Sequence, residues 1–201
     1  TNVEKSYATG YLAKTWNEQG VRTITQKFIQ TGNVGMSEDI ELHRKIMGTG
    51  LLPEDESGLT MPEIFTYPCS PHLAAEIDHR PIDFDKIEKA TRQLSETYDA
   101  VLLEGAGGLM VPLTRDLLTI DYVAQKNYPL IFVTSGKLGS INHTLLSLEA
   151  VTRRGIRLHT VAYNLFPEED DDIIRRDTEA YISDLLAKEY PETHFVIVPK
   201  L

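Results

Sequence analysis

The feature that most constrains this chain is a series of short, continuously apolar segments separated by helical patterns. Residues 101–103, 130–133 and 195–198 are apolar throughout and lack the alternation of a strand with one face in water. Such segments are typical of parallel strands covered on both faces. Their alternation with helical patterns predicts an α/β doubly wound domain, in which helices flank a mostly parallel sheet.

The element boundaries carry recognisable signals. Ser37 and Ser70 are expected to cap helix N-termini, and Pro71 suits a first helical position. Gly20 and Gly155 follow helical patterns as stops. We expect helices over 7–19, 37–46, 70–77, 83–97, 118–127, 140–154 and 170–188. We expect strands over 21–29, 100–105, 129–136, 159–165 and 194–199. With 201 residues and neither repeat nor linker, the chain is predicted to be one domain over 1–201.

Charge and composition exclude several classes of function. The formal net charge is -10 and the pI is about 5.0, which argues against a nucleic-acid partner or an anionic membrane surface. No apolar run approaches the roughly 20 residues that cross a bilayer. Cys69 is the single cysteine, so no disulfide can form within the chain, and a reducing cytoplasmic location is expected.

Polar and glycine-rich residues gather at the predicted strand ends. Lys27 lies near the end of the predicted strand over 21–29, Glu104 and the loop 135–140 follow apolar strands, and Asn164 and Pro199 stand at the ends of the last two. Taken singly, each is more simply a surface lysine, a turn glycine or a helix cap. Ligands of open α/β sheets bind at the carboxyl ends of the strands, so the convergence of these residues predicts a binding site there.

The N-terminal segment "VEKS" is similar to the end of the P-loop pattern G-x-x-x-x-G-K-[ST]. Lys5 and Ser6 form its final pair, and Glu4 stands where its last glycine belongs. The first glycine and the preceding strand would lie before residue 1, so the first strand of the sheet is expected to be missing. Lys5 would pair with terminal phosphates, and Ser6, Asp39 and Glu104 would hold Mg²⁺ together with phosphate oxygens and water.

Seven motifs in order carry a family resemblance: "VEKS", "QKFIQTG", "SEDIEL", "CSPHLAAE", "LLEGAGGLMVPL", "GKLGSINHTLL" and "YN". Together they resemble the dethiobiotin synthetase family over nearly the whole chain. The resemblance implies a P-loop NTPase-like fold, a homodimer, and an ATP- and Mg²⁺-dependent cyclo-ligase of biotin biosynthesis. In that family 7,8-diaminopelargonate and CO₂ (or bicarbonate) give a carbamate, ATP converts it to a carbamic-phosphoric anhydride, and ring closure gives dethiobiotin.

The resemblance also implies roles for individual residues. The catalytic residues are Thr1, Lys5 and Lys27. The nucleotide-binding residues are Val3, Glu4, Lys5, Ser6, Tyr7, Asn164 and Pro199. The metal ligands are Ser6, Asp39 and Glu104. The substrate-binding residues are Lys27, Thr31, Ser70, Gly107, Leu138, Gly139, Ser140 and Asn142, with Leu138–Asn142 receiving the substrate carboxylate across the dimer interface.

Glu4 is the main departure from the family pattern. A glutamate adds a Cβ and a negative charge where the backbone of a P-loop approaches phosphate. An alternative is therefore a degenerate family member that binds ligand without turnover. A partitioning-type ATPase, which shares the P-loop fold, is disfavoured by the acidic composition and by "SPH" and "KLGSINH".

Overall fold

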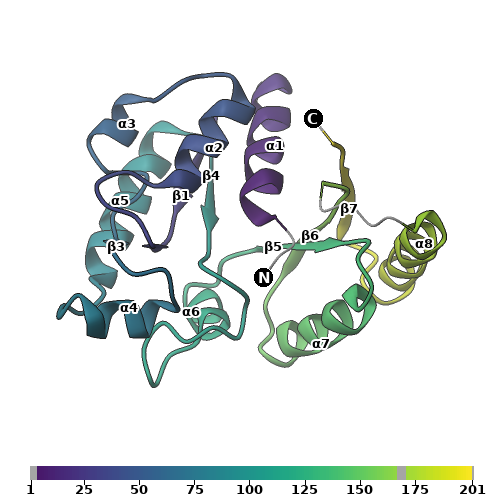
Figure 1. The fold of residues 1–201 in the computed structure, drawn as a ribbon. Coiled ribbons are helices and arrows are strands. Elements are labelled where there is room, and N and C mark those ends of the chain that lie inside the picture. Colours follow the sequence, from purple (N-terminus) through teal and green to yellow (C-terminus); the bar gives the residue numbers. More distant parts are fainter. Residues whose placement is uncertain (1–3, 167–170, 201) are drawn as a thin grey trace. The chain divides into compact units, whose positions relative to one another are not determined.

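The computed structural model describes residues 4–166 and 171–200. These residues form two compact units (Figure 1). One is Thr9–Thr119, and the other joins the described residues up to Ala8 with those from Ile120 onward. Both units contain parallel strands with helices packed on them, which confirms the predicted α/β class. The prediction of one domain over 1–201 stays a prediction.

The unit Thr9–Thr119 is built on two pairs of parallel strands. β1 (Thr23–Lys27) pairs with β4 (Ala100–Glu104), and Lys27 lies opposite Glu104 in the register. β2 (Gln30–Thr31) pairs with β3 (Ile64–Phe65). The helices are α2 (Glu38–Met47), α3 (Pro53–Glu56), α4 (Pro71–Ile77) and α5 (Phe84–Thr97). Helix α2 packs on β1 and α5 packs on β4, with Ile24, Ile40, Ile87 and Leu94 in the core.

The other unit contains a parallel sheet in the order β5-β6-β7. Its strands are β5 (Leu130–Ser135), β6 (Leu158–Asn164) and β7 (His194–Val198). Helix α7 (Ser140–Arg153) packs against β5 and against α8 (Asp172–Glu189). The boundary between the units falls within α1 (Lys5–Glu18), and at the start of α6 (Thr119–Gln125).

The expected N-terminal caps are partly confirmed. The Ser37 side chain accepts a hydrogen bond from the amide of Ile40 and so caps α2. Ser70 stands at the N-cap of α4, but its hydroxyl lies 3.1 Å from Nδ1 of His72 and makes no capping bond. The N-cap of α7 is Gly139, whose φ is 92°. A residue without a side chain adopts this left-handed conformation at little cost.

The burial of the strands differs from the expectation in one respect. Strands β1 and β6 are almost wholly buried, but residues 100–103 of β4 and 130–133 of β5 are half-buried. In β7, residues 195–197 are likewise half-buried or exposed. Edge position alone does not explain the difference, because β1 also has a single strand partner among the described residues and is wholly buried.

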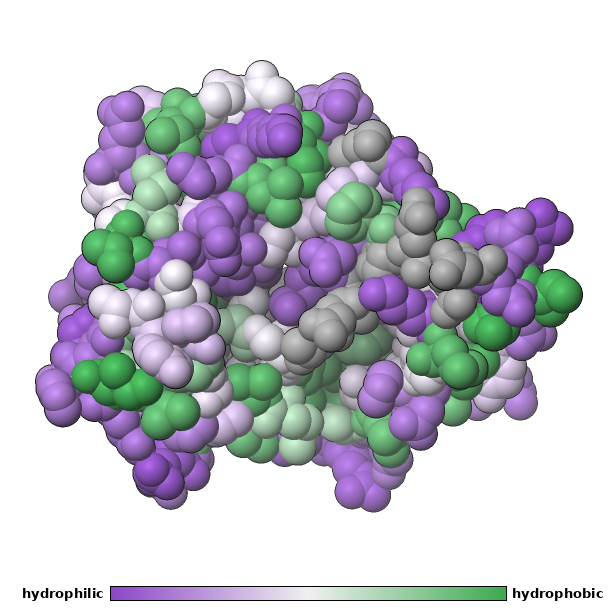
Figure 2. Space-filling view, in the orientation of Figure 1, coloured by the Kyte–Doolittle hydropathy of each residue, from purple (hydrophilic) through white to green (hydrophobic). Residues whose placement is uncertain are grey.

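The surface mixes polar and apolar side chains. Hydrophobic residues on the face in Figure 2 lie singly or in small groups among hydrophilic ones. The most exposed large apolar side chains are Val34, Leu138 and Ile173. Among the described helices, none combines the length and apolar character needed to cross a membrane.

Candidate active site

The centre of the site in the unit Thr9–Thr119 is a buried lysine between two carboxylates. Because β1 and β4 are parallel and in register, Lys27 and Glu104 end neighbouring strands side by side. Lys27 Nζ lies 2.8 Å from Oε1 of Glu104, and it also forms an ion pair with Oδ2 of Asp39 from the first turn of α2. Lys27 and Glu104 are each only 5% exposed. The structure thus brings together three of the residues predicted from the sequence.

The charges in this cluster stabilise one another. Burial alone would raise the pKa of the Glu104 carboxyl, but the Lys27 ammonium and the His43 hydrogen bond hold that pKa well below its usual range. Burial would likewise lower the pKa of Lys27, yet the carboxylates of Glu104 and Asp39 raise it above the ordinary value. At neutral pH, Lys27 is therefore a fixed cation and Glu104 a fixed anion.

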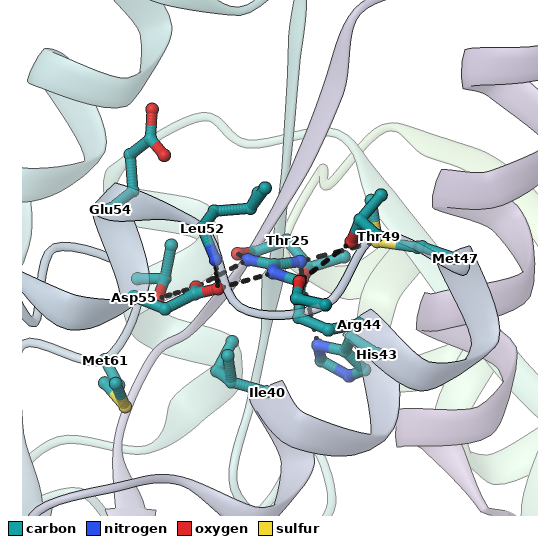
Figure 3. A network of polar contacts seen from close by, with 12 residues as sticks. Thr25, Ile40, His43, Arg44, Met47, Thr49, Leu52, Glu54, Asp55 and Met61 are labelled. Carbon is teal, nitrogen blue, oxygen red and sulfur yellow. Dashed lines mark hydrogen bonds and ion pairs between the residues drawn. The ribbon is translucent and has the colours of Figure 1, made fainter.

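A buried polar network lies behind Glu104, and sequence reasoning missed it. His43 and Arg44, adjacent on α2, are both buried and both contact the hydroxyl of Thr25 on β1 (Figure 3). The other ring nitrogen of His43 lies 2.7 Å from Oε2 of Glu104. Arg44 forms a bidentate ion pair with Asp55 of α3. The available signal was weak: a threonine within the polar strand segment Thr23–Lys27 and a histidine–arginine pair on the next helix.

The predicted substrate residues Thr31, Ser70 and Gly107 of the same unit lie at the ends of its elements or in its loops. Thr31 ends β2, and the following Gly32 packs against Pro68, two residues before Ser70. Gly107 follows β4 with φ 71°, and a Cβ on it would lie 2.8 Å from Cγ2 of Val111. A side chain at position 107 is therefore disfavoured both by the backbone conformation and by the contact with Val111.

The other unit contains the predicted nucleotide residues. Glu4 precedes α1 with φ 49°, the left-handed conformation that a P-loop glycine adopts at no cost. Asn164, at the end of β6, donates a hydrogen bond to the Glu4 carbonyl at 3.2 Å. Tyr7 stacks on Phe166 at 4.3 Å and donates its hydroxyl proton to the carbonyl of Pro199. The start of α1 is thus tied to the ends of β6 and β7.

Lys5 and Ser6 open α1 in this unit and are half-buried. The loop before α7 presents Leu138, which is 81% exposed, and Asn142 is exposed on the first turn. The Ser140 hydroxyl is instead buried and lies 3.3 Å from that of Ser135. Thr1 and Val3, predicted as catalytic and nucleotide-binding, lie outside the described residues.

The acidic pair fits a divalent cation. The carboxylates of Asp39 and Glu104 converge on one cation, the Lys27 ammonium. Carboxylate oxygens suit Mg²⁺, which takes one or two of them and completes its shell with phosphate oxygens and water. Within the described ranges, no group of three histidine, cysteine or acidic side chains could hold a metal by itself.

Comparison with known proteins defines the class of this protein first. The sequence profile of the AAA domain family matches residues 1–199. With the parallel α/β architecture and Lys5-Ser6 at the start of α1, this match defines a P-loop-type nucleotide-binding protein.

Curated relatives then narrow the family. ATP-dependent dethiobiotin synthetase BioD 2 of Pasteurella multocida is 50% identical over 198 residues, 98% of this chain and 92% of the relative. The Haemophilus influenzae protein of the same name is 56% identical over 176 residues, 88% of this chain and 92% of the relative. ATP-dependent dethiobiotin synthetase BioD of Chlorobaculum tepidum is 51% identical over 179 residues, 89% of this chain and 75% of the relative. The chain belongs to the ATP-dependent dethiobiotin synthetase family.

Proposed function

We propose that the protein is an ATP- and Mg²⁺-dependent ligase of biotin biosynthesis, which converts 7,8-diaminopelargonate and CO₂ to dethiobiotin. The observation that carries the proposal is the buried Lys27 cation beside Asp39 and Glu104. A fixed cation suits a substrate that becomes anionic, as an amine does when it is carboxylated to a carbamate.

The residues would act mainly by positioning and by charge, which is what phosphoryl transfer demands. Lys27 orients the carbamate oxygen that attacks the terminal phosphoryl group of ATP, and ADP leaves. The second amine then attacks the carbamic carbon of the anhydride, phosphate leaves, and the cyclic urea forms. Lys5 stabilises charge on the transferring group.

The remaining residues would hold the ligands. Ser6, Asp39 and Glu104 are the residues that would hold Mg²⁺, which neutralises phosphate charge when bound. Thr31, Ser70 and Gly107 would line the diamine site. Exposed Leu138 and Asn142 support a role of their loop in receiving the substrate carboxylate from the second protomer of a homodimer.

The test is product formation by the purified protein. ADP and phosphate release should require both 7,8-diaminopelargonate and bicarbonate, and dethiobiotin should be detected by mass spectrometry. ATP hydrolysis that proceeds equally without the diamine would contradict the proposal.

A second candidate function is a binding protein that does not turn over ATP. The conformation and charge of Glu4 favour it, because Glu4 occupies the position of a P-loop glycine. Calorimetric binding of the diamine without ATP consumption would support this candidate over the enzyme.

A further inference from the structure

We propose that His43 is a positioning residue for Glu104, which receives its Nε2 proton, and that Thr25, held by Arg44 and Asp55, supports the other ring nitrogen. The inference rests on the proposed function for one point, that Lys27 acts on the carbamate and Glu104 on Mg²⁺. The hydrogen-bond direction itself follows from donors and acceptors in the unit Thr9–Thr119.

The argument begins at Arg44, whose five N–H groups all have acceptors. Nε and Nη2 donate to the Asp55 carboxylate at 2.8 Å each. Nη2 also donates to the Thr25 carbonyl at 3.3 Å. Nη1 donates to the Thr25 hydroxyl at 2.8 Å and to Sδ of Met47 at 3.4 Å. An arginine side chain has no acceptor, so the Thr25 oxygen must accept from it.

The Glu104 carboxylate is ionised and can only accept hydrogen bonds, so the 2.7 Å contact to its Oε2 requires a proton on Nε2 of His43. Nδ1 of His43 lies 3.0 Å from the Thr25 hydroxyl oxygen. Because this oxygen already accepts from Arg44, we assign its own proton to the hydrogen bond with Nδ1. The direction of the chain of hydrogen bonds runs from Arg44 through Thr25 and His43 to Glu104.

Glu104 is held at both oxygens as a result. His43 binds Oε2, and Lys27 binds Oε1. His43 is completely buried, so water cannot replace its hydrogen bond without opening the core. The carboxylate cannot rotate, and Oε1 stays directed at Lys27. Hydrogen-bond partners of ligating carboxylates typically change metal affinity or activity by about 10–100-fold when removed.

Two substitutions separate positioning from simple filling of the core. His43→Gln retains an amide donor near the place of Nε2 and loses the acceptor for Thr25. His43→Asn retains an acceptor near the place of Nδ1 and loses the donor to Glu104. Each removes one buried hydrogen bond, but His43→Asn removes more side-chain volume and leaves a charged acceptor unpaired, so we expect it to lower the free energy of unfolding more. The kinetic comparison is therefore made under conditions in which both variants are fully folded.

The kinetic prediction is asymmetric. We expect His43→Asn to lower kcat by about 10–100-fold, and His43→Gln to stay within about threefold of the unchanged protein. Equal losses of kcat in the two folded variants would overturn the positioning role.

Nitrogen-15 NMR of the full protein tests the inference without turnover. We expect a His43 ring with a proton on Nε2 that is hydrogen-bonded to Glu104, and a slowly exchanging Lys27 ammonium that persists in His43→Gln and is lost in His43→Asn. A proton on Nδ1 with Nε2 bare would overturn the inference. If the unchanged protein releases no diamine-dependent ADP, the proposed function fails, and these NMR signals still decide the role of His43.

Discussion

The ammonium of Lys27 lies 2.8 Å from Oε1 of Glu104, at the matched ends of two parallel strands, and both side chains are buried. Desolvated charges of this kind are costly to separate. The pair therefore links the stability of the unit Thr9–Thr119 to the chemistry proposed for it.

Replacing Lys27 by methionine should lower kcat by about 10²–10³-fold, the usual effect of removing one preorganised stabilising group. It should also decrease the free energy of unfolding by about 3–5 kcal/mol, because the buried Glu104 anion would lose its counter-ion and keep only the His43 hydrogen bond. Dethiobiotin formation and urea unfolding measure the two effects. Lys89→Met is the matched control, since Lys89 is exposed and should change neither. A Lys27→Met protein that is less stable but fully active would restrict Lys27 to a structural role.

Glu4 offers a separate test in the other unit. Glu4→Gly removes a carboxylate and restores a residue suited to φ 49°. If Glu4 faces the phosphates, the dissociation constant for ATP should fall at least about tenfold, because two like charges about 4 Å apart repel by roughly 4 kcal/mol near a protein surface.

The variant Glu4→Gln separates charge from conformation. Glu4→Gln removes the charge and keeps the Cβ. An increase in ATP affinity that is found only in Glu4→Gly is therefore due to the backbone conformation. Calorimetric titration with ATP gives both constants. The same ATP affinity in all three proteins would falsify the claim that Glu4 opposes ATP binding.

Gly107→Ala should decrease the free energy of unfolding by about 1–3 kcal/mol, since a Cβ meets Val111 and the backbone has a positive φ. In the double variant with Val111→Ala, the clash is removed and the conformational strain remains. We expect a partial recovery relative to Val111→Ala alone, measured in a double-mutant cycle. If the two substitutions change the free energy of unfolding additively, the contact between position 107 and Val111 is unimportant.

The Asp55–Arg44 pair should give a defined pH dependence. Burial tends to raise the pKa of Asp55, but hydrogen bonds from Arg44, Thr60 and the Leu52 amide hold it below the ordinary 3.8. A lowered pKa in the folded protein means that the stabilisation is complete above pH 3.8 and is lost as the pH falls below it.

Asp55→Asn should therefore be less stable than the unchanged protein by about 3–5 kcal/mol at pH 7, because Arg44 loses its buried counter-ion. This difference should shrink progressively below pH 3.8. Denaturant unfolding between pH 7 and pH 3 measures it. A difference that is constant across this range would mean that the Asp55 charge contributes no stability.

Much of the fold followed from the sequence because its signals are local. Ser37 before an amphipathic segment predicted the start of α2, and apolar runs predicted β4, β5 and β7 within one or two residues. The two-residue strands β2 and β3 and the four-residue helix α3 were missed, because they are too short to show a period and depend on tertiary contacts.

The site residues also divide into those with a local sequence signal and those that depend on tertiary contacts. Lys27 and Glu104 were predictable because each directly ends a recognisable strand, and parallel pairing brings such residues together. His43, Arg44 and Asp55 were not, because charged residues in a helix are usually solvent-exposed. Their burial depends on three separate segments meeting, which no single stretch of sequence reveals.

The one-way chain of protons from Arg44 to Glu104 has an evolutionary consequence. His43 requires the hydroxyl of Thr25, and that hydroxyl is oriented by Arg44. A lineage that replaces His43 with an apolar residue leaves the Thr25 proton without its acceptor, so a second replacement at position 25 becomes favourable. Substitutions at these two positions, 18 residues apart in the chain, should therefore be inherited together among relatives.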